Sequence, residues 1–136
     1  MENIEVLLVE DNPADVLLVR VALSQVPFPL RLLVANDGEQ ALQMLVASDF
    51  QPQLIILDLN MPRVDGQTVL QQCQKTQIPI VIFSSTQNNA EVQKALALGA
   101  REYVQKPIGF ESYSDAVQGM VKRWIAPPAQ PALPTS

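Results

Sequence analysis

The sequence predicts an α/β domain built on a parallel sheet, and three observations support this class. Short runs of apolar and β-branched residues alternate with longer segments in which apolar residues recur at helical spacing. The run Leu54 to Leu57 is apolar without interruption, which is typical of a strand buried on both faces. Proline, glycine, asparagine and aspartate separate the segments. This alternation indicates βαβ units with helices on both faces of the sheet.

The elements follow in order along the chain. Strands are expected over Ile4 to Val9, Leu30 to Ala35, Leu54 to Leu57, Ile80 to Phe83 and Glu102 to Gln105. One helix is expected to start at the Asn12-Pro13 pair and to stop before Pro27, and the others span Glu39 to Val46, Gly66 to Lys75, Ala90 to Leu98 and Phe110 to Ile125. Right-handed crossovers favour a flavodoxin-like, doubly wound five-stranded parallel sheet of order 2-1-3-4-5 with five helices.

Length and composition limit the classes of protein. The 136 residues, 48% of them hydrophobic, suit one globular domain over residues 1–125, and residues 126–136 are expected to form a Pro-rich disordered tail. The net charge of −5 disfavours direct DNA binding. No apolar run is long enough to span a membrane, and the start of the chain does not fit a signal peptide. We therefore expect a cytoplasmic protein in which the single cysteine, Cys73, is a packed helix residue.

The chain has no histidine, which restricts its chemistry. Catalysis by Ser-His-Asp or Cys-His groups is excluded, as are most zinc sites. Any metal must be held by oxygen ligands, and such ligands favour Mg²⁺, Mn²⁺ or Ca²⁺.

Chemically suggestive residues follow four of the predicted strands, namely Glu10, Asp11, Asp58, Ser84 and Lys106. In the order 2-1-3-4-5 these strand ends are neighbours, so the side chains should converge on one cleft. Two carboxylates about 4 Å apart repel by roughly 4 kcal/mol at an effective dielectric constant near 20, so three of them require a cation. Lys106 alone cannot neutralise them, and Mg²⁺ together with an incoming phosphate would. A carboxylate can also act as the nucleophile that accepts a phosphoryl group.

Several motifs resemble those of the two-component response regulator receiver domain. They are the acidic pair Glu10-Asp11, the stretch from Asp58 to Gly66, Ser84, the segment Leu98 to Val104, and Lys106-Pro107. The resemblance covers roughly residues 4 to 125, so its motifs are spread along most of the chain. It implies a signalling protein rather than an enzyme, with at most self-phosphorylation from small donors and slow autodephosphorylation.

The resemblance also implies roles for individual residues. Asp58 would accept a phosphoryl group from the phosphohistidine of a sensor histidine kinase. Mg²⁺ would be held by Glu10, Asp11, Asp58 and the backbone carbonyl of Asn60. Lys106 would pair with the phosphate, and Pro107 is a candidate for a cis peptide bond.

Two further residues would form the switch. Ser84 would move to bond the phosphoryl group, and Tyr103 would then turn inward. From the residues alone, Ser85 or Thr86 could replace Ser84, and Tyr103 could be an ordinary half-buried sheet residue.

The region Glu10 to Val19 and a late tryptophan, Trp124, are similar to stand-alone regulators that serve bacterial phytochrome kinases. Such relatives imply a homodimer, and no output domain is expected after the last helix. The dimer or partner face would lie on the helix over Ala90 to Leu98, the strand over Glu102 to Gln105 and the helix over Phe110 to Ile125. It would include Val92, Tyr103, Tyr113, Val117 and Trp124. Trp124 could instead serve only in packing.

Two other functions compete with phosphorelay signalling. A haloacid-dehalogenase-like phosphatase also uses an aspartate at a strand end, but it usually needs a second aspartate at the position of Asn60. The other alternative is a degenerate receiver that acts as a binding scaffold or phosphate sink. The complete set of acidic residues, serine and lysine argues against it.

Overall fold

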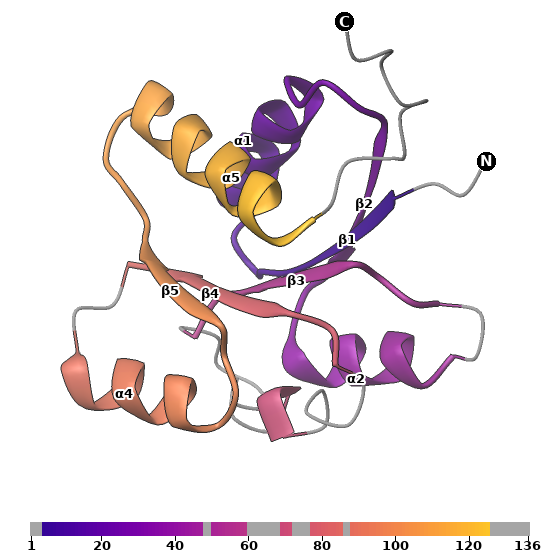
Figure 1. Cartoon of the computed structure of the whole chain (residues 1–136), viewed down its shortest axis with the longest axis vertical. Coiled ribbons are helices and arrows are strands. Elements are labelled where there is room, and N and C mark those ends of the chain that lie inside the picture. Colours follow the sequence, from indigo (N-terminus) through magenta and orange to yellow (C-terminus); the bar gives the residue numbers. More distant parts are fainter. Residues whose placement is uncertain (1–3, 48–49, 60–68, 72–76, 86–87, 126–136) are drawn as a thin grey trace, which may run out of the picture.

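A computed structural model describes residues 4–47, 50–59, 69–71, 77–85 and 88–125 of the chain. The strands are β1 (Ile4–Val9), β2 (Leu30–Ala35), β3 (Leu54–Leu57), β4 (Ile80–Ser84) and β5 (Glu102–Gln105), and the described helices are α1 (Pro13–Ser24), α2 (Gly38–Val46), α4 (Asn89–Ala97) and α5 (Phe110–Trp124) (Figure 1). All five predicted strands are confirmed. β4 is one residue longer than predicted, which makes Ser84 the last residue of the strand.

The sheet has the predicted order β2-β1-β3-β4-β5, and every neighbouring pair is parallel. β3 is the central strand, between β1 and β4, and it is buried along its whole length. The uninterrupted apolar run of β3 is explained by this position, because both faces of the strand are covered by other parts of the protein.

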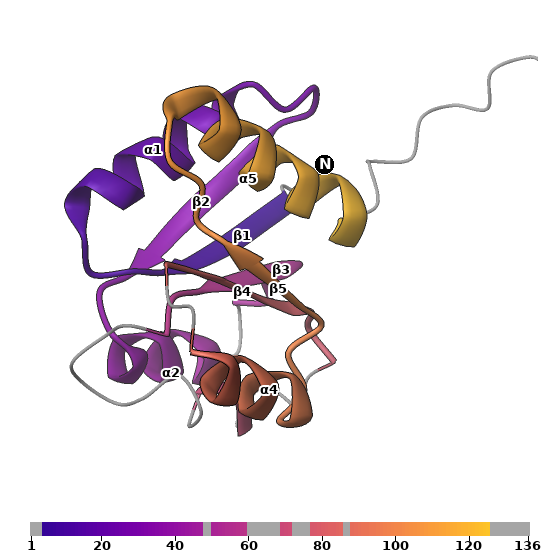
Figure 2. The ribbon, with the colours of Figure 1, turned by 90° about the vertical axis from the view of Figure 1, so that its left-hand side faces the viewer.

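Helices cover both faces of the sheet. α1 and α5 lie together on one face, and α2 and α4 lie on the other (Figures 1 and 2). Each face has its own apolar core: Val6, Leu8, Ile56 and Phe83 point towards α1 and α5, while Leu7, Val9, Ile55 and Ile82 belong to the opposite core. The alternation of side chains along each strand produces this division.

Local sequence signals fix the helix ends. The Asn12 side chain accepts a hydrogen bond from the backbone N–H of Ala14 and so caps α1, which confirms that the helix starts at the Asn12-Pro13 pair. Asp37 and Asn88 cap α2 and α4 in the same way. Gly99 follows α4 with φ of +114°, a backbone conformation that glycine adopts most readily.

Some predictions fall on residues outside the described part of the chain. They concern most of the helix over 66–75 with Cys73, the Asn60 carbonyl and the tail over 126–136. Residues 69–71 are helical, as predicted, and both Val69 and Leu70 are buried. Over the described ranges, none of the helices has the length and apolar character that crossing a membrane requires.

Candidate functional site

The predicted site residues meet at the carboxyl edge of the sheet because the strand ladder continues one residue past each strand. The Asp58 N–H donates to the Val9 carbonyl at 3.1 Å, which places Asp58 beside the end of β1. The Lys106 N–H donates to the Ser84 carbonyl at 2.9 Å, which places Lys106 beside the end of β4. Backbone hydrogen bonds therefore fix the positions from which the Asp58 and Lys106 side chains extend.

The Lys106 ammonium lies among three carboxylates. Its Nζ is 2.6 Å from Oε1 of Glu10, 3.1 Å from Oδ2 of Asp58 and 3.3 Å from Oδ2 of Asp15. The Lys106 side chain is only 10% exposed, and Glu10 and Asp58 are buried. Water therefore screens these charges less than it would at the surface.

Sequence reasoning missed Asp15, together with the residue that holds it. The Tyr113 hydroxyl donates a hydrogen bond to Oδ1 of Asp15 at 2.8 Å, while the other carboxylate oxygen faces Lys106. Asp15 lies in the first turn of α1, which begins at Pro13, two residues after the Glu10-Asp11 pair. That position was the available signal, since the first turn of the helix starts at the same edge of the sheet.

The acidic residues fit a divalent cation. One carboxylate oxygen each from Glu10, Asp11 and Asp58 lie within 4.8 Å of one another. With Asp15, the cluster contains four carboxylates and one ammonium group, so it carries excess negative charge when all are ionised. Oxygen-only donors with excess negative charge suit a hard cation such as Mg²⁺. The three side chains that were predicted to hold the metal are thus brought together.

Burial and charge shift the pKa values in the cluster. Burial, opposed by the hydrogen bond from Lys106 and reinforced by the charge of Asp58, raises the pKa of Glu10 to about 7. Burial alone would lower the pKa of Lys106, but its hydrogen bond to Glu10 and the charge of Asp58 outweigh that effect and raise it. Lys106 is therefore a permanent cation at neutral pH, and Glu10 titrates near neutrality.

The two predicted switch residues are adjacent. Ser84 is fully buried at the end of β4. Tyr103 is half-buried on β5, and its hydroxyl donates to the Ser84 carbonyl at 3.5 Å, a long hydrogen bond. Burial, with the charge of Asp58, raises the pKa of Tyr103. The hydroxyl of Tyr103 is therefore close enough to this strand end to respond to a change there.

The cis peptide bond expected at Pro107 is not present. Among the described residues every peptide bond is trans, including Lys106–Pro107. The trans form is also the more stable one by about 0.5–1 kcal/mol for a bond that precedes proline.

Two members of the predicted dimer or partner face are buried instead. Tyr113 is 4% exposed and Val117 is fully buried, and both lie in the core that α5 shares with α1 and the sheet. They belong, with Met120 and Val121, to the buried stripe of α5. Val92, Tyr103 and Trp124 are half-buried, and Nε1 of Trp124 donates to Oε1 of Glu102 at 2.8 Å. Only these three residues remain as candidates for that face.

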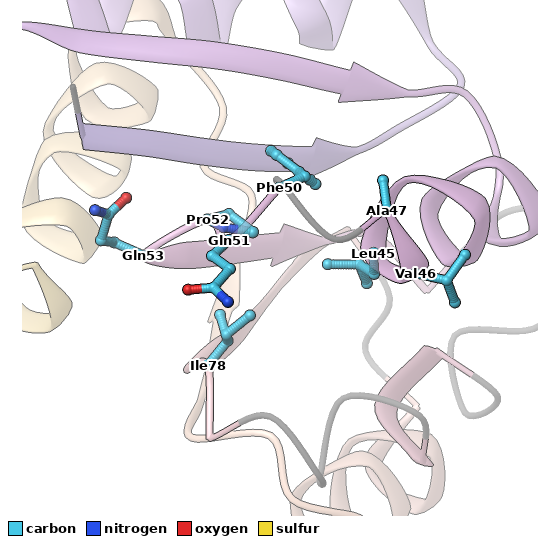
Figure 3. A pocket seen from close by; sticks show the side chains of 8 residues that line it. All are labelled: Leu45, Val46, Ala47, Phe50, Gln51, Pro52, Gln53 and Ile78. Atoms are coloured by element: carbon cyan, nitrogen blue, oxygen red, sulfur yellow. The ribbon is translucent and has the colours of Figure 1, made fainter. Parts of the chain in front are cut away.

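A cavity of about 520 Å³ lies elsewhere, at the amino edge of the sheet (Figure 3). It is lined by the end of α2, by Phe50 to Gln53 before β3, and by Ile78 before β4. A smaller hollow adjoins it through Ala47 and Phe50. Neither contains a predicted site residue. The acidic cluster at the opposite edge is therefore the candidate functional site.

Fold and site together define a class of protein: a parallel α/β domain with a buried aspartate, a lysine and further carboxylates at the strand ends. Comparison with known proteins supports this class. The family model described as response regulator receiver domain matches residues 6–118. This chain belongs to the response regulator receiver family.

Individual relatives match over most of their length. The probable methanogenesis regulatory protein FilR2 of Methanothrix harundinacea is 30% identical over 128 residues, which cover 88% of this chain and 83% of FilR2. Response regulator Rcp1 of Synechocystis is 30% identical over 136 residues, which cover 93% and 92%.

Solved structures show the same fold. The phosphorylated cyanobacterial phytochrome response regulator RcpA superimposes with a TM-score of 0.85 at 29% identity, covering 92% of this chain and 96% of that one. The Mn²⁺-bound form of Rcp1 gives a TM-score of 0.82 at 30% identity, covering 94% and 99%.

Proposed function

We propose that the chain is a phosphoryl-accepting switch in which Asp58 receives the group from the phosphohistidine of a sensor histidine kinase. One carboxylate oxygen of Asp58 bonds to phosphorus as the P–N bond breaks, and the electron pair of that bond stays on the imidazole nitrogen. The observation that carries the proposal is the 3.1 Å contact between Asp58 Oδ2 and the Lys106 ammonium, at the centre of an acidic cluster.

The remaining residues support this step. Glu10, Asp11 and Asp58, with the backbone carbonyl of Asn60, would hold Mg²⁺, which when bound neutralises charge on the phosphoryl oxygens. The Lys106 ammonium is already aimed at Asp58, so a phosphoryl group on Asp58 would meet a fixed positive charge. The buried Ser84 hydroxyl at the neighbouring strand end would donate a hydrogen bond to a phosphoryl oxygen.

The output would be a change in binding. A shift at Ser84 would reach Tyr103 through the hydrogen bond from Tyr103 to the Ser84 carbonyl. Tyr103, Val92 and Trp124 would then alter a face over α4, β5 and α5 that pairs with a second copy or with another protein. RcpA is described as a phytochrome response regulator, and this supports a phytochrome as the source of the signal.

The first test is the intact mass of the protein after incubation with acetyl phosphate and Mg²⁺. We expect one phosphoryl group to be added to the natural protein, and none to Asp58→Asn or in the presence of a chelator. Asp115→Asn makes the same change at an exposed position on α5 and should behave like the natural protein. Phosphoramidate provides a second donor that contains a P–N bond.

The outcomes separate the candidate functions. A mass gain that requires both Asp58 and Mg²⁺ supports the phosphoacceptor. No gain from either donor, with the protein folded, would overturn it in favour of a scaffold. Gel filtration with and without beryllofluoride tests the switch, and an unchanged elution volume together with unchanged partner binding would contradict it.

A further inference from the structure

The Lys106 ammonium has a third carboxylate partner that the metal cluster does not require. Asp15 lies on α1, and its Oδ2 is 3.3 Å from Nζ of Lys106. An ammonium group has three protons, and Glu10, Asp58 and Asp15 offer three acceptor oxygens around it. A long lysine side chain has several rotatable bonds, so a third anchor restricts where its charge can lie.

Asp15 is itself held in place from α5. The Tyr113 hydroxyl donates to Oδ1 of Asp15 at 2.8 Å, so each oxygen of this carboxylate has its own partner. The Tyr113 ring is buried and packs edge-on against Phe83, with ring centroids 5.0 Å apart. Phe83 in turn lies below the ammonium of Lys106, 6.0 Å from Nζ to the ring centroid.

These contacts form a closed ring of four residues from four different parts of the fold. Lys106 follows β5, Asp15 belongs to α1, Tyr113 to α5 and Phe83 to β4. We propose that Asp15, held by the Tyr113 hydroxyl, is a positioning residue that aims the Lys106 ammonium at Asp58 and ties it to the α1–α5 interface. This role in phosphoryl transfer rests on the proposed function, but the positioning of Lys106 does not.

The structure gives an order to the effects. Tyr113 does not contact Lys106 through any described hydrogen bond, so its hydroxyl acts through Asp15. Removing the hydroxyl should loosen Lys106 less than neutralising Asp15 does. Once Asp15 is neutralised, removing the hydroxyl should have little further effect, because residues that act in series are not additive.

The experiment measures how fast Lys106 reacts with a limiting amine-acylating reagent, by peptide mass spectrometry of the folded chain. Lys94 and Lys122 are exposed and provide the internal reference. In Asp15→Asn we expect Lys106 to be labelled about threefold faster, the factor that corresponds to a weak ion pair. Tyr113→Phe should give a smaller increase, and the double variant should match Asp15→Asn. Asp115→Asn, the same change at an exposed site, should leave Lys106 labelling unaltered.

Several outcomes would overturn the proposal. Unchanged Lys106 labelling in folded Asp15→Asn would show that Asp15 does not position the lysine. A double variant whose effect is the product of the single effects would show that Tyr113 does not act through Asp15. Faster labelling of Lys106 in Asp115→Asn as well would indicate general loosening of the fold, and would also contradict positioning.

Phosphorylation kinetics provide the functional readout. In Asp15→Asn the maximal rate with acetyl phosphate and saturating Mg²⁺ should fall, while the donor concentration at half-saturation stays the same, because the lysine is present but poorly aimed. A raised half-saturation at an unchanged maximal rate would contradict this. If the natural protein accepts no phosphoryl group at all, the proposed function fails, and the labelling comparison still decides the positioning of Lys106.

Discussion

Nζ of Lys106 lies 2.6 Å from Oε1 of Glu10, although the two residues are 96 positions apart in the chain. Glu10 is 2% exposed, so its carboxylate depends on this partner for most of its charge compensation. The same lysine contacts Asp58, the proposed phosphoacceptor. Substitution of Glu10 or Lys106 should therefore change both the stability of the protein and its ligand binding.

The first prediction concerns the pH dependence of stability without metal. The pKa of Glu10 is about 7 in the folded protein and about 4.5 when unfolded, so its contribution is fully present below pH 4.5 and is lost as the pH rises through 7. Between pH 5 and pH 8 the free energy of unfolding of the natural protein should fall by on the order of 2 kcal/mol more than that of Glu10→Gln, which cannot ionise. Urea unfolding with a chelator measures this difference. The same pH dependence of stability in both proteins would show that Glu10 is not the group responsible for it.

The affinity for Mg²⁺ should also depend on the protonation of Glu10. It should rise with pH, whereas the stability without metal falls. A protonated Glu10 cannot act as an anionic ligand, so a proton and the metal compete for it. With a pKa of about 7 for Glu10, the dissociation constant at pH 6 should be about tenfold higher than at pH 8. Calorimetric titration at both pH values measures it. Glu10→Gln should bind Mg²⁺ weakly and with little pH dependence; a tenfold change retained in this variant would point to another group.

Removing the lysine should destabilise the protein while leaving it folded. In Lys106→Ala the buried carboxylates of Glu10 and Asp58 lose their shared cation, and breaking a buried pair in this way costs about 3 kcal/mol or more at pH 8. Millimolar Mg²⁺ should restore part of the loss, because it binds only the folded cluster. Lys94→Ala, at an exposed position, is the matched control. Equal stability of the two variants without metal would contradict a buried pair.

The buried side of α5 can be tested by truncation. Val117 is fully buried between α5 and the core, so Val117→Ala should cost about 2 kcal/mol through lost burial and a small cavity. Val46 is 82% exposed, and Val46→Ala should change stability by no more than about 0.5 kcal/mol. Chemical denaturation compares the two. Equal losses of stability in the two variants would indicate that Val117 is exposed rather than buried.

Two glycines should respond to alanine in opposite directions. Gly99 has φ of +114°, a conformation that alanine rarely adopts, so Gly99→Ala should cost about 1–2 kcal/mol. Gly119 is inside α5, where a Cβ would lie 2.9 Å from Nη1 of Arg123, the far end of a long side chain that is 48% exposed and pairs with Glu102. Gly119→Ala should therefore be neutral or stabilise by up to about 1 kcal/mol, since alanine favours helix. Thermal unfolding measures the stability of both variants. Stabilisation by Gly99→Ala would contradict the prediction.

Much of the site could be predicted because its residues are tied to strand ends. A predicted strand that ends at charged or polar residues is visible in the sequence, and in a parallel sheet the carboxyl ends of the strands lie at one edge. Glu10, Asp58, Ser84 and Lys106 were found in this way, and the structure brings Glu10, Asp58 and Lys106 into direct contact. The metal ion and the phosphoryl group stay predictions.

One error was avoidable. Tyr113, Val117, Met120 and Val121 recur at positions i, i+4, i+7 and i+8, which predicts a single buried stripe on α5. Placing Tyr113 and Val117 on a partner face followed the resemblance rather than this spacing. The trans bond at Pro107, in contrast, has no signal in the local sequence.

The sequence by itself determined the strands, the helix caps, the parallel sheet and the identity of the residues at its carboxyl edge. These features depend on periodicity and on neighbours close along the chain. Only the tertiary structure decided that Asp15 and Tyr113 meet and that Lys106 lies among three carboxylates. Asp15 and Tyr113 are 98 positions apart, and their contact depends on how α1 and α5 pack across one face of the sheet. No local pattern encodes that distance, because it is set by the packing of the whole core.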